Sequence, residues 1–113
     1  MKNRVLLIGH LGGDPDIRST DTGKKWARLS LATNESFQNA RGERVTETQW
    51  HNLVAWGKQA EYVEKYMSKG CEVAVDGKLV SRSYVDKEGL KKYITEIHIN
   101  DSLLLGERKP ANV

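Results

Sequence analysis

The chain has 113 residues, which is enough for one domain with a modest hydrophobic core. Its formal charge of +3 comes from 18 Lys and Arg against 15 Asp and Glu, an excess too small to indicate a nucleic-acid partner by itself. A single cysteine, Cys71, excludes an internal disulfide and fits a reducing compartment. No apolar run is long enough for a signal peptide or a membrane span, so we expect a cytoplasmic protein without a membrane partner.

Apolar and alternating segments predict five strands. Residues 5–8 form a continuous apolar run, as in a buried strand. Residues 26–33 alternate instead, and this period places Ala27, Leu29 and Leu31 on one face. The segments expected as strands are 5–8, 26–33, 45–55, 72–80 and 92–105, with a further short strand at 17–20.

One segment has helical rather than strand periodicity. Between residues 57 and 70, an apolar stripe at positions i, i+3 and i+7 is formed by Ala60, Val63 and Met67. Gly70 follows as a C-terminal stop signal. The order of three strands, a helix and two strands predicts an all-β OB-fold, a five-stranded Greek-key barrel with one α-helix between strands 3 and 4.

Aromatic residues stand in segments that are otherwise polar. Trp50 and Trp56 are six residues apart on one side of a strand, where they would form a platform about 20 Å long. Phe37 lies in the polar stretch 34–39, and Tyr84 lies shortly before a predicted turn. Rings beside scattered Lys and Arg suit an unpaired nucleic-acid strand, because each base offers a π-face and each phosphate a negative charge.

Cations near these rings are candidate phosphate contacts. Lys58 and Arg82 are the most direct candidates, because each stands within two residues of an aromatic ring. Sequence specificity is not expected, since base reading needs donors and acceptors fixed against base edges. The full set of candidate cations is Arg4, Arg41, Arg44, Lys58, Lys69, Lys78, Arg82, Lys87 and Lys92.

Each of these residues also has an ordinary structural interpretation. From spacing and charge alone, core packing accounts for Trp50 and Trp56 as well as base stacking does. Tyr84 is alternatively a cross-strand pairing residue, and Phe37 is alternatively a loop anchor. Any single Lys or Arg is alternatively a solvated surface charge.

No metal or catalytic constellation is recognisable in the sequence. His10, His51 and His98 are scattered, and Cys71 has no partner at a metal-ligand spacing, so we expect neither a metal nor a cofactor. We also expect a binding protein rather than an enzyme, although a dispersed catalytic triad leaves no local signature.

Short motifs follow one another along nearly the whole chain. They are residues 3–12 (NRVLLIGHLG), 14–15 with Arg18, 31–37 (LATNESF), 48–51 (TQWH), 56–58 (WGK), 69–70 (KG), 75–79 (VDGKL) and 82–84 (RSY). Each motif is weak alone. In this order and spacing they resemble the bacterial single-stranded DNA-binding protein (SSB) family, from residue 3 to about residue 105.

The resemblance implies an OB-fold homotetramer that wraps single-stranded DNA without base preference during replication, recombination and repair. The family's four base-stacking positions fall on Phe37, Trp50, Trp56 and Tyr84, which are all aromatic in this chain. Trp26 stands where members usually carry a small aliphatic residue, so the resemblance implies no DNA role for it.

The C-terminal end departs from the family pattern. Typical members carry a long tail whose acidic, hydrophobic tip recruits replication and repair proteins, whereas this chain stops at Val113. We expect either a trimmed chain or a naturally short form, and we expect such partners only if the full-length form has the tail. We expect residues 1–105 to form the DNA-binding domain, residues 106–113 to be a flexible remnant, and the protein to associate with the nucleoid.

Three alternative functions remain open from the sequence. The first is a related OB module of a primosome or an RNA-binding protein. The second is an OB-type nuclease, which would need clustered carboxylates that are not apparent. The third is a purely structural oligomer that binds no nucleic acid.

Overall fold

The computed structural model describes residues 2–106, so the predicted remnant lies outside the described residues except for Gly106. The described chain forms six strands and one helix. They are β1 (Val5–Leu11), β2 (Asp16–Ser19), β3 (Lys25–Gln38), β4 (Arg44–Trp56), α1 (Lys58–Tyr66), β5 (Glu72–Val85) and β6 (Lys91–Leu104).

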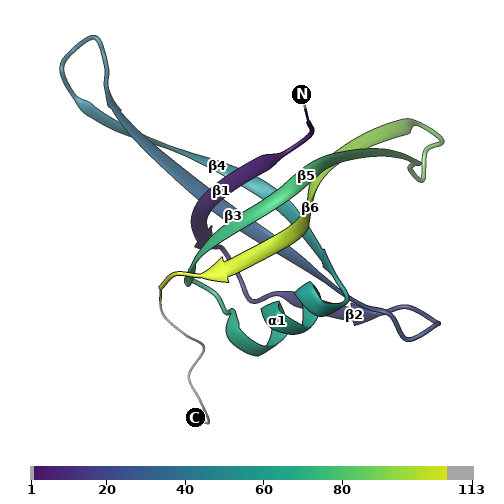
Figure 1. The fold of residues 1–113 in the computed structure, drawn as a ribbon. Helices are drawn as coiled ribbons and strands as arrows, with labels where there is room; N and C mark the ends of the chain where they lie inside the picture. Colours follow the sequence, from purple (N-terminus) through teal and green to yellow (C-terminus); the bar gives the residue numbers. More distant parts are fainter. Residues whose placement is uncertain (1, 107–113) are drawn as a thin grey trace.

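The five long strands close into a barrel (Figure 1). Their order is β1-β5-β6-β4-β3, and β1 also pairs with β3 through Leu11 and Leu31, which completes the circle. The pairing of β4 with β6 is parallel, and the other pairings are antiparallel. The short strand β2 is added outside this circle, on β3. The predicted five-stranded Greek-key barrel, with its helix between the third and fourth long strands, is therefore confirmed.

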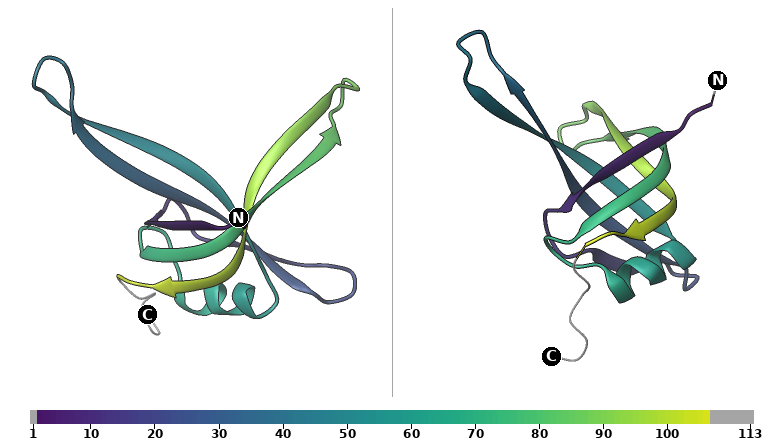
Figure 2. Two further views of the ribbon diagram at one scale, coloured as in Figure 1. Left: turned by 45° about the horizontal axis from the view of Figure 1, so that its top comes forward. Right: turned by 60° about the vertical axis from the view of Figure 1, so that its left-hand side comes forward.

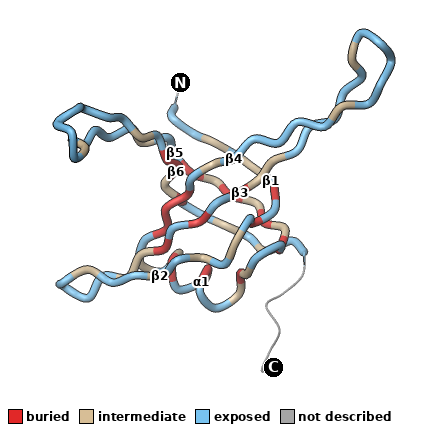
Figure 3. Tube along the Cα trace, turned by 180° about the vertical axis from the view of Figure 1, so that it is seen from behind, coloured by how far each residue is buried: buried red, intermediate tan, exposed pale blue. Residues whose placement is uncertain are grey.

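The core lies inside the barrel and under α1, where the buried residues gather (Figure 3). Ala27, Leu29 and Leu31 are buried on the inner face of β3, as their alternation predicts. Opposite them in the register, β4 contributes the fully buried Leu53 and Ala55. The even-numbered residues of both strands consequently face outward at the barrel wall.

The helix α1 closes one end of the barrel, and it is shorter than its sequence pattern predicts. Ala60 and Val63 are buried as expected, but the helix ends at Tyr66 rather than at residue 70. Met67 adopts an extended backbone and is 1% exposed, and the chain then turns so that the Gly70 N–H donates to the Leu11 carbonyl. This tertiary bond to β1 requires the chain to leave the helix early. No helix in the described part of the chain is long and apolar enough to cross a membrane.

Two hairpins extend beyond the barrel as long arms (Figures 1 and 2). In the β3–β4 arm, residues 34–38 belong to β3, although the sequence analysis ended that strand at residue 33. Polar cross-strand bonds hold this arm, such as Thr48 Oγ1 to Asn34 Oδ1 at 2.6 Å. In the β5–β6 arm, β5 likewise continues past residue 80 to Val85. Alternation with a buried face ends where the barrel ends, so the sequence pattern missed the outer parts of β3 and β5, although it predicted β4 and β6 over nearly their whole length.

Candidate nucleic-acid interface

The outward face of β4 carries the two tryptophans that the sequence places on one side. The register sets Trp50 opposite Ala32 and Trp56 opposite Trp26, all at even-numbered positions facing away from the core. Trp50 is 61% exposed and Trp56 is 37% exposed. Core packing, the alternative interpretation of both rings, is therefore wrong for this chain.

Trp50 lies against the turn that follows β1. A Cβ atom added to Gly12 would stand 2.4 Å from Cζ3 of the Trp50 ring, so only glycine leaves room for the indole there. The Gly12 N–H is itself bonded to the Ser30 carbonyl on β3, which holds the turn in place. The exposed ring thus rests on ordered backbone.

Trp56 is paired with a residue to which the sequence analysis gave no DNA role. The rings of Trp26 and Trp56 are stacked, with centroids 5.8 Å apart and planes 29° from parallel. The Lys24 ammonium lies 4.9 Å from the Trp56 ring centroid, and the Arg28 guanidinium carbon lies 5.7 Å from that of Trp26. Both distances are within cation–π range. Alternation around Ala27 already implies that Trp26 points outward, and this signal was available in the sequence.

A hollow of about 190 Å³ opens beside this pair, and we call it the tryptophan hollow. It forms where the parallel pairing of Val54 with His98 brings β6 alongside β4. The residues that line it are Trp26, Arg28, Val54, Trp56, Arg82, Glu96 and His98. Arg82 is thus the candidate cation that the fold places directly beside Trp56.

The hollow is also lined by a buried carboxylate that no sequence motif indicates. Glu96 is 4% exposed, and its Oε1 accepts a bond from Arg82 Nε at 3.0 Å and lies 3.2 Å from His98 Nε2. Burial alone would raise the pKa of Glu96, but the bonds from Arg82 and then His98 outweigh it and hold that pKa below its usual value. Nothing in the local sequence distinguishes this glutamate from a surface one.

The other two candidate rings lie on the arms. Tyr84 is 49% exposed on β5, directly opposite Lys92 on β6. Phe37 is 45% exposed near the tip of the β3–β4 arm, where Ser36, Gln38 and Arg44 line a hollow with it. It is an odd number of residues from Ala32, the partner of Trp50, so it points to the other face of the arm. The four rings therefore lie at separate positions on the barrel and the arms, and they do not form one flat platform.

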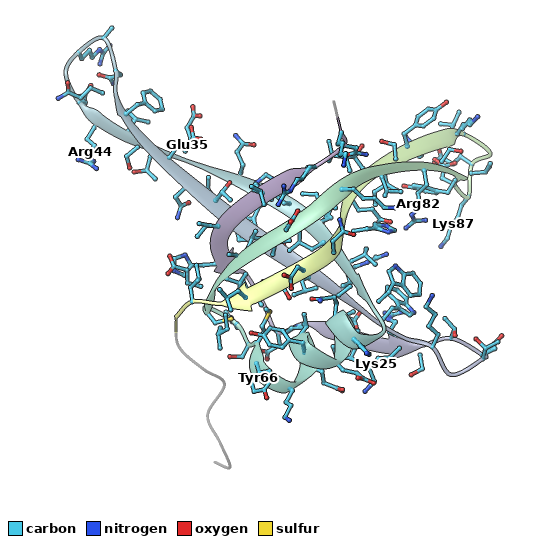
Figure 4. All side chains as sticks on the ribbon, in the orientation of Figure 1. Lys25, Glu35, Arg44, Tyr66, Arg82 and Lys87 are labelled. Carbon is cyan, nitrogen blue, oxygen red and sulfur yellow. The ribbon has the colours of Figure 1, made fainter. Side chains whose placement is uncertain are left out.

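The candidate cations are likewise distributed over the barrel and both arms. Arg41 lies in the turn of the β3–β4 arm. Figure 4 shows Arg44 near the tip of this arm and Lys87 at the end of the β5–β6 arm. These three are exposed. The set is completed by Lys58 at the start of α1, Lys69 in the turn after it, Lys78 opposite His98, and Lys92 beside Tyr84.

Arg4, like Arg82, is already engaged by a carboxylate. Its Nε and Nη2 donate to the two oxygens of Asp76 at 3.2 and 2.9 Å. This pair raises the pKa of Arg4, with the hydrogen bond as the largest cause. A phosphate at this position would have to compete with Asp76.

A closed five-stranded barrel with this strand order and a single helix at this position defines an OB-fold protein. Residues 2–105 match the sequence model of the Single-strand binding protein family, and the chain belongs to that family.

Similar proteins are known from several organisms. The chain is 45% identical over 107 residues to the Single-stranded DNA-binding protein 1 of Chlorobaculum tepidum, covering 94% of this chain and 66% of that protein. It is 46% identical over 112 residues to the Single-stranded DNA-binding protein 1 of Staphylococcus aureus, covering 99% and 70%. The chain thus spans about two thirds of the length of these relatives. A Plasmodium falciparum SSB solved in complex with ssDNA has a TM-score of 0.84 and 35% identity, covering 93% of this chain and 96% of that one.

Proposed function

We propose that this protein binds single-stranded DNA without base preference. The observation that carries the proposal is the exposure of Trp50 and Trp56 on the outward barrel wall, with cations placed beside Trp56. Family membership and the similarity to an SSB solved with ssDNA support it. We further propose that Phe37 and Tyr84 stack bases on the arms, and that the candidate cations neutralise phosphates along the path between them.

The mechanism follows from the chemistry of these groups. Each base stacked on an aromatic ring contributes about 1–3 kcal/mol whatever its identity, and each neutralised phosphate releases counterions. A ligand that binds only the unpaired state shifts the duplex equilibrium towards it. The protein would therefore protect single strands and remove hairpins in replication, recombination and repair. It would do this by binding alone, not as an enzyme, with the nucleoid as its site of action in the cytoplasm.

A salt-dependent titration with oligo-dT tests this function. Tryptophan fluorescence should be quenched on binding, and log K should fall linearly with log salt concentration by about 0.7 for each phosphate neutralised. A matched RNA oligomer serves as the competitor, and the labelled strand should remain intact with Mg²⁺ or Ca²⁺. Absence of quenching, preference for RNA, or cleavage of the strand would each refute the proposal.

We propose that the protein assembles into a homotetramer through the surface of β1. Leu6 and Ile8 are 65% and 63% exposed there, and they line a hollow of about 310 Å³ with Leu103. Within the described chain, residues 5–9 pair only with β5, so one edge of this segment is free. An apolar strand with a free edge favours pairing with a second copy. Replication and repair proteins would be recruited only by a longer form that carries an acidic tail.

A further inference from the structure

Trp26 is an aromatic residue on the outer face of the barrel that the family pattern does not explain. Resting on the function proposed above, we propose that Trp26 is a further base-stacking residue. Together with Trp56 it would form a subsite in which one unpaired nucleobase occupies the tryptophan hollow. The subsite would be a property of this chain's own sequence, because it depends on an indole at position 26.

Geometry is the first support for this subsite. Both indoles line the same hollow, and their stacked rings stand on neighbouring strands directly across the register. Val54, 3% exposed, supplies an apolar surface between them and β6. Neither indole N–H has a hydrogen-bond partner within the described residues, so both remain available as donors. A concave, mostly apolar site with a few polar groups is what a flat heteroaromatic ligand requires.

Charge is the second support. Lys24 and Arg28 lie over the two rings, and neither forms an ion pair with a carboxylate in the described part of the chain. Arg82 contributes a third cation at the opposite wall, although Glu96 already binds its Nε. Phosphates on either side of a base in the hollow would therefore meet Lys24 and Arg28, which no acidic side chain in the described residues engages.

A second aromatic pair, Tyr62 and Tyr66, packs within the fold and serves for comparison with Trp26 and Trp56. Tyr62 and Tyr66 on α1 have centroids 5.0 Å apart, with Lys65 lying 5.3 Å from the Tyr66 ring. The Tyr62 hydroxyl, however, accepts a bond from the Leu104 N–H, which ties the pair to β6. Tyr66 therefore provides a matched control. Like Trp26, its ring is partly exposed, packs against a second ring and lies near a cation, but it does not line the tryptophan hollow.

A double-mutant cycle tests whether Trp26 contacts DNA itself. Trp26→Val, Trp56→Val and the double variant are titrated with a short oligo-dT, with Tyr66→Val as the control and thermal melting to confirm folding. Trp26→Val should weaken binding by about 5- to 150-fold, the range expected for one lost stack, while Tyr66→Val leaves it unchanged. Trp26→Val should weaken binding further when Trp56 is already Val. No further loss there would mean that Trp26 only positions Trp56, which overturns the proposal.

A spectroscopic variant keeps the test independent of stability. Because the chain has three tryptophans, Trp50→Phe combined with Trp56→Phe leaves Trp26 as the sole indole. Its fluorescence should be quenched by saturating oligo-dT and not by an abasic backbone of equal length. Unquenched fluorescence at saturation refutes the subsite.

If the wild-type protein itself fails to bind oligo-dT, the proposed function fails. If the wild type binds and Trp26→Val binds equally well, only the subsite fails.

Discussion

Single residues decide how the aromatic rings are presented. Trp50 is exposed because it occupies an outward position on β4, and Gly12 leaves the space in which its ring lies. Trp56 is less exposed because Trp26 covers one side of it. Exposed rings of this size are unfavourable in water, so their retention on the wall is consistent with a ligand that covers them.

Gly12→Ala is expected to weaken DNA binding more than it weakens the fold. The added Cβ would meet the Trp50 ring at 2.4 Å, and the exposed ring would swing away from its position. Affinity for oligo-dT should fall by up to the 1–3 kcal/mol of about one stack, while the melting temperature changes little. Gly13→Ala is the matched control, because a Cβ there meets nothing within 4 Å. Equal affinity of the two variants would contradict this role of Gly12.

Glu96 gives the protein a predicted loss of stability in acid. The pKa of this carboxyl is lower in the folded protein than in the unfolded chain. Its stabilising contribution is therefore fully present above the unfolded pKa, about 4.3, and is lost as pH falls through the lower folded pKa. Glu96→Gln should lower the free energy of unfolding by roughly 1–2 kcal/mol near neutral pH. It should also make the free energy of unfolding less dependent on pH below the unfolded pKa.

Urea unfolding between pH 3 and 7 measures this effect. Asp16→Asn is the control, because Asp16 forms an exposed pair with Arg18 at 3.1 Å, and exposed pairs contribute little. If the free energy of unfolding of Glu96→Gln depends on pH as that of the wild type does, the buried carboxylate does not govern the loss of stability in acid.

At the level of secondary structure, the arms extend the proposed binding surface well beyond the barrel. The outer half of the β3–β4 arm is held by backbone pairing and by polar pairs such as Ser36 with Thr46, not by a buried face. Gly42 allows the tight turn at its tip with φ of 79°. The arm therefore presents Phe37 and its neighbouring cations on a surface that is exposed on both sides.

Removing the arm's cations should change the salt dependence of binding. Arg41→Ala and Arg44→Ala are each expected to reduce the slope of log K against log salt by about 0.7, since each removes one phosphate contact. Arg18→Ala is the control, because Arg18 is on β2 and is bonded to Asp16. An unchanged slope in the double variant would place the DNA path away from this arm.

At the level of the whole molecule, one side of the barrel is left apolar and incompletely paired. The exposed Leu6 and Ile8 alternate with Leu7, which packs against the core, so β1 is apolar on both faces. Exposing both apolar faces of an edge strand to water is unfavourable, so such a strand favours contact with another surface that covers it. This is the physical basis of the proposed tetramer.

Ile8→Glu should dissociate the assembly. A charge on this strand would have to be desolvated at the interface, so the mass measured by light scattering should fall from four chains to fewer. Leu90→Glu is the control: Leu90 is 54% exposed at the end of the β5–β6 arm, away from β1. A wild-type protein of one chain, or an Ile8→Glu variant that keeps the wild-type mass, would refute assembly through β1.

Local periodicity in the sequence was sufficient to predict the strands and the helix that form the barrel. The alternation of Ala27, Leu29 and Leu31, the helical stripe of Ala60 and Val63, and the order of these segments are short-range properties. Side-chain direction repeats with the backbone period, so neighbouring residues alone determine which side of a strand faces inward. That Trp50 and Trp56 share one side of a strand followed for the same reason, whereas the structure decided that this side faces outward.

Only the tertiary structure decided which distant residues meet at the candidate site. The tryptophan hollow exists because β6 closes against β4, which brings Arg82 and Glu96 beside Trp56. The pairing of Trp26 with Trp56 likewise depends on the register of the β3–β4 hairpin over its full length, since the two residues lie at its open end. The turn, the packing of the whole core and barrel closure together set this arrangement, and no short-range pattern encodes it.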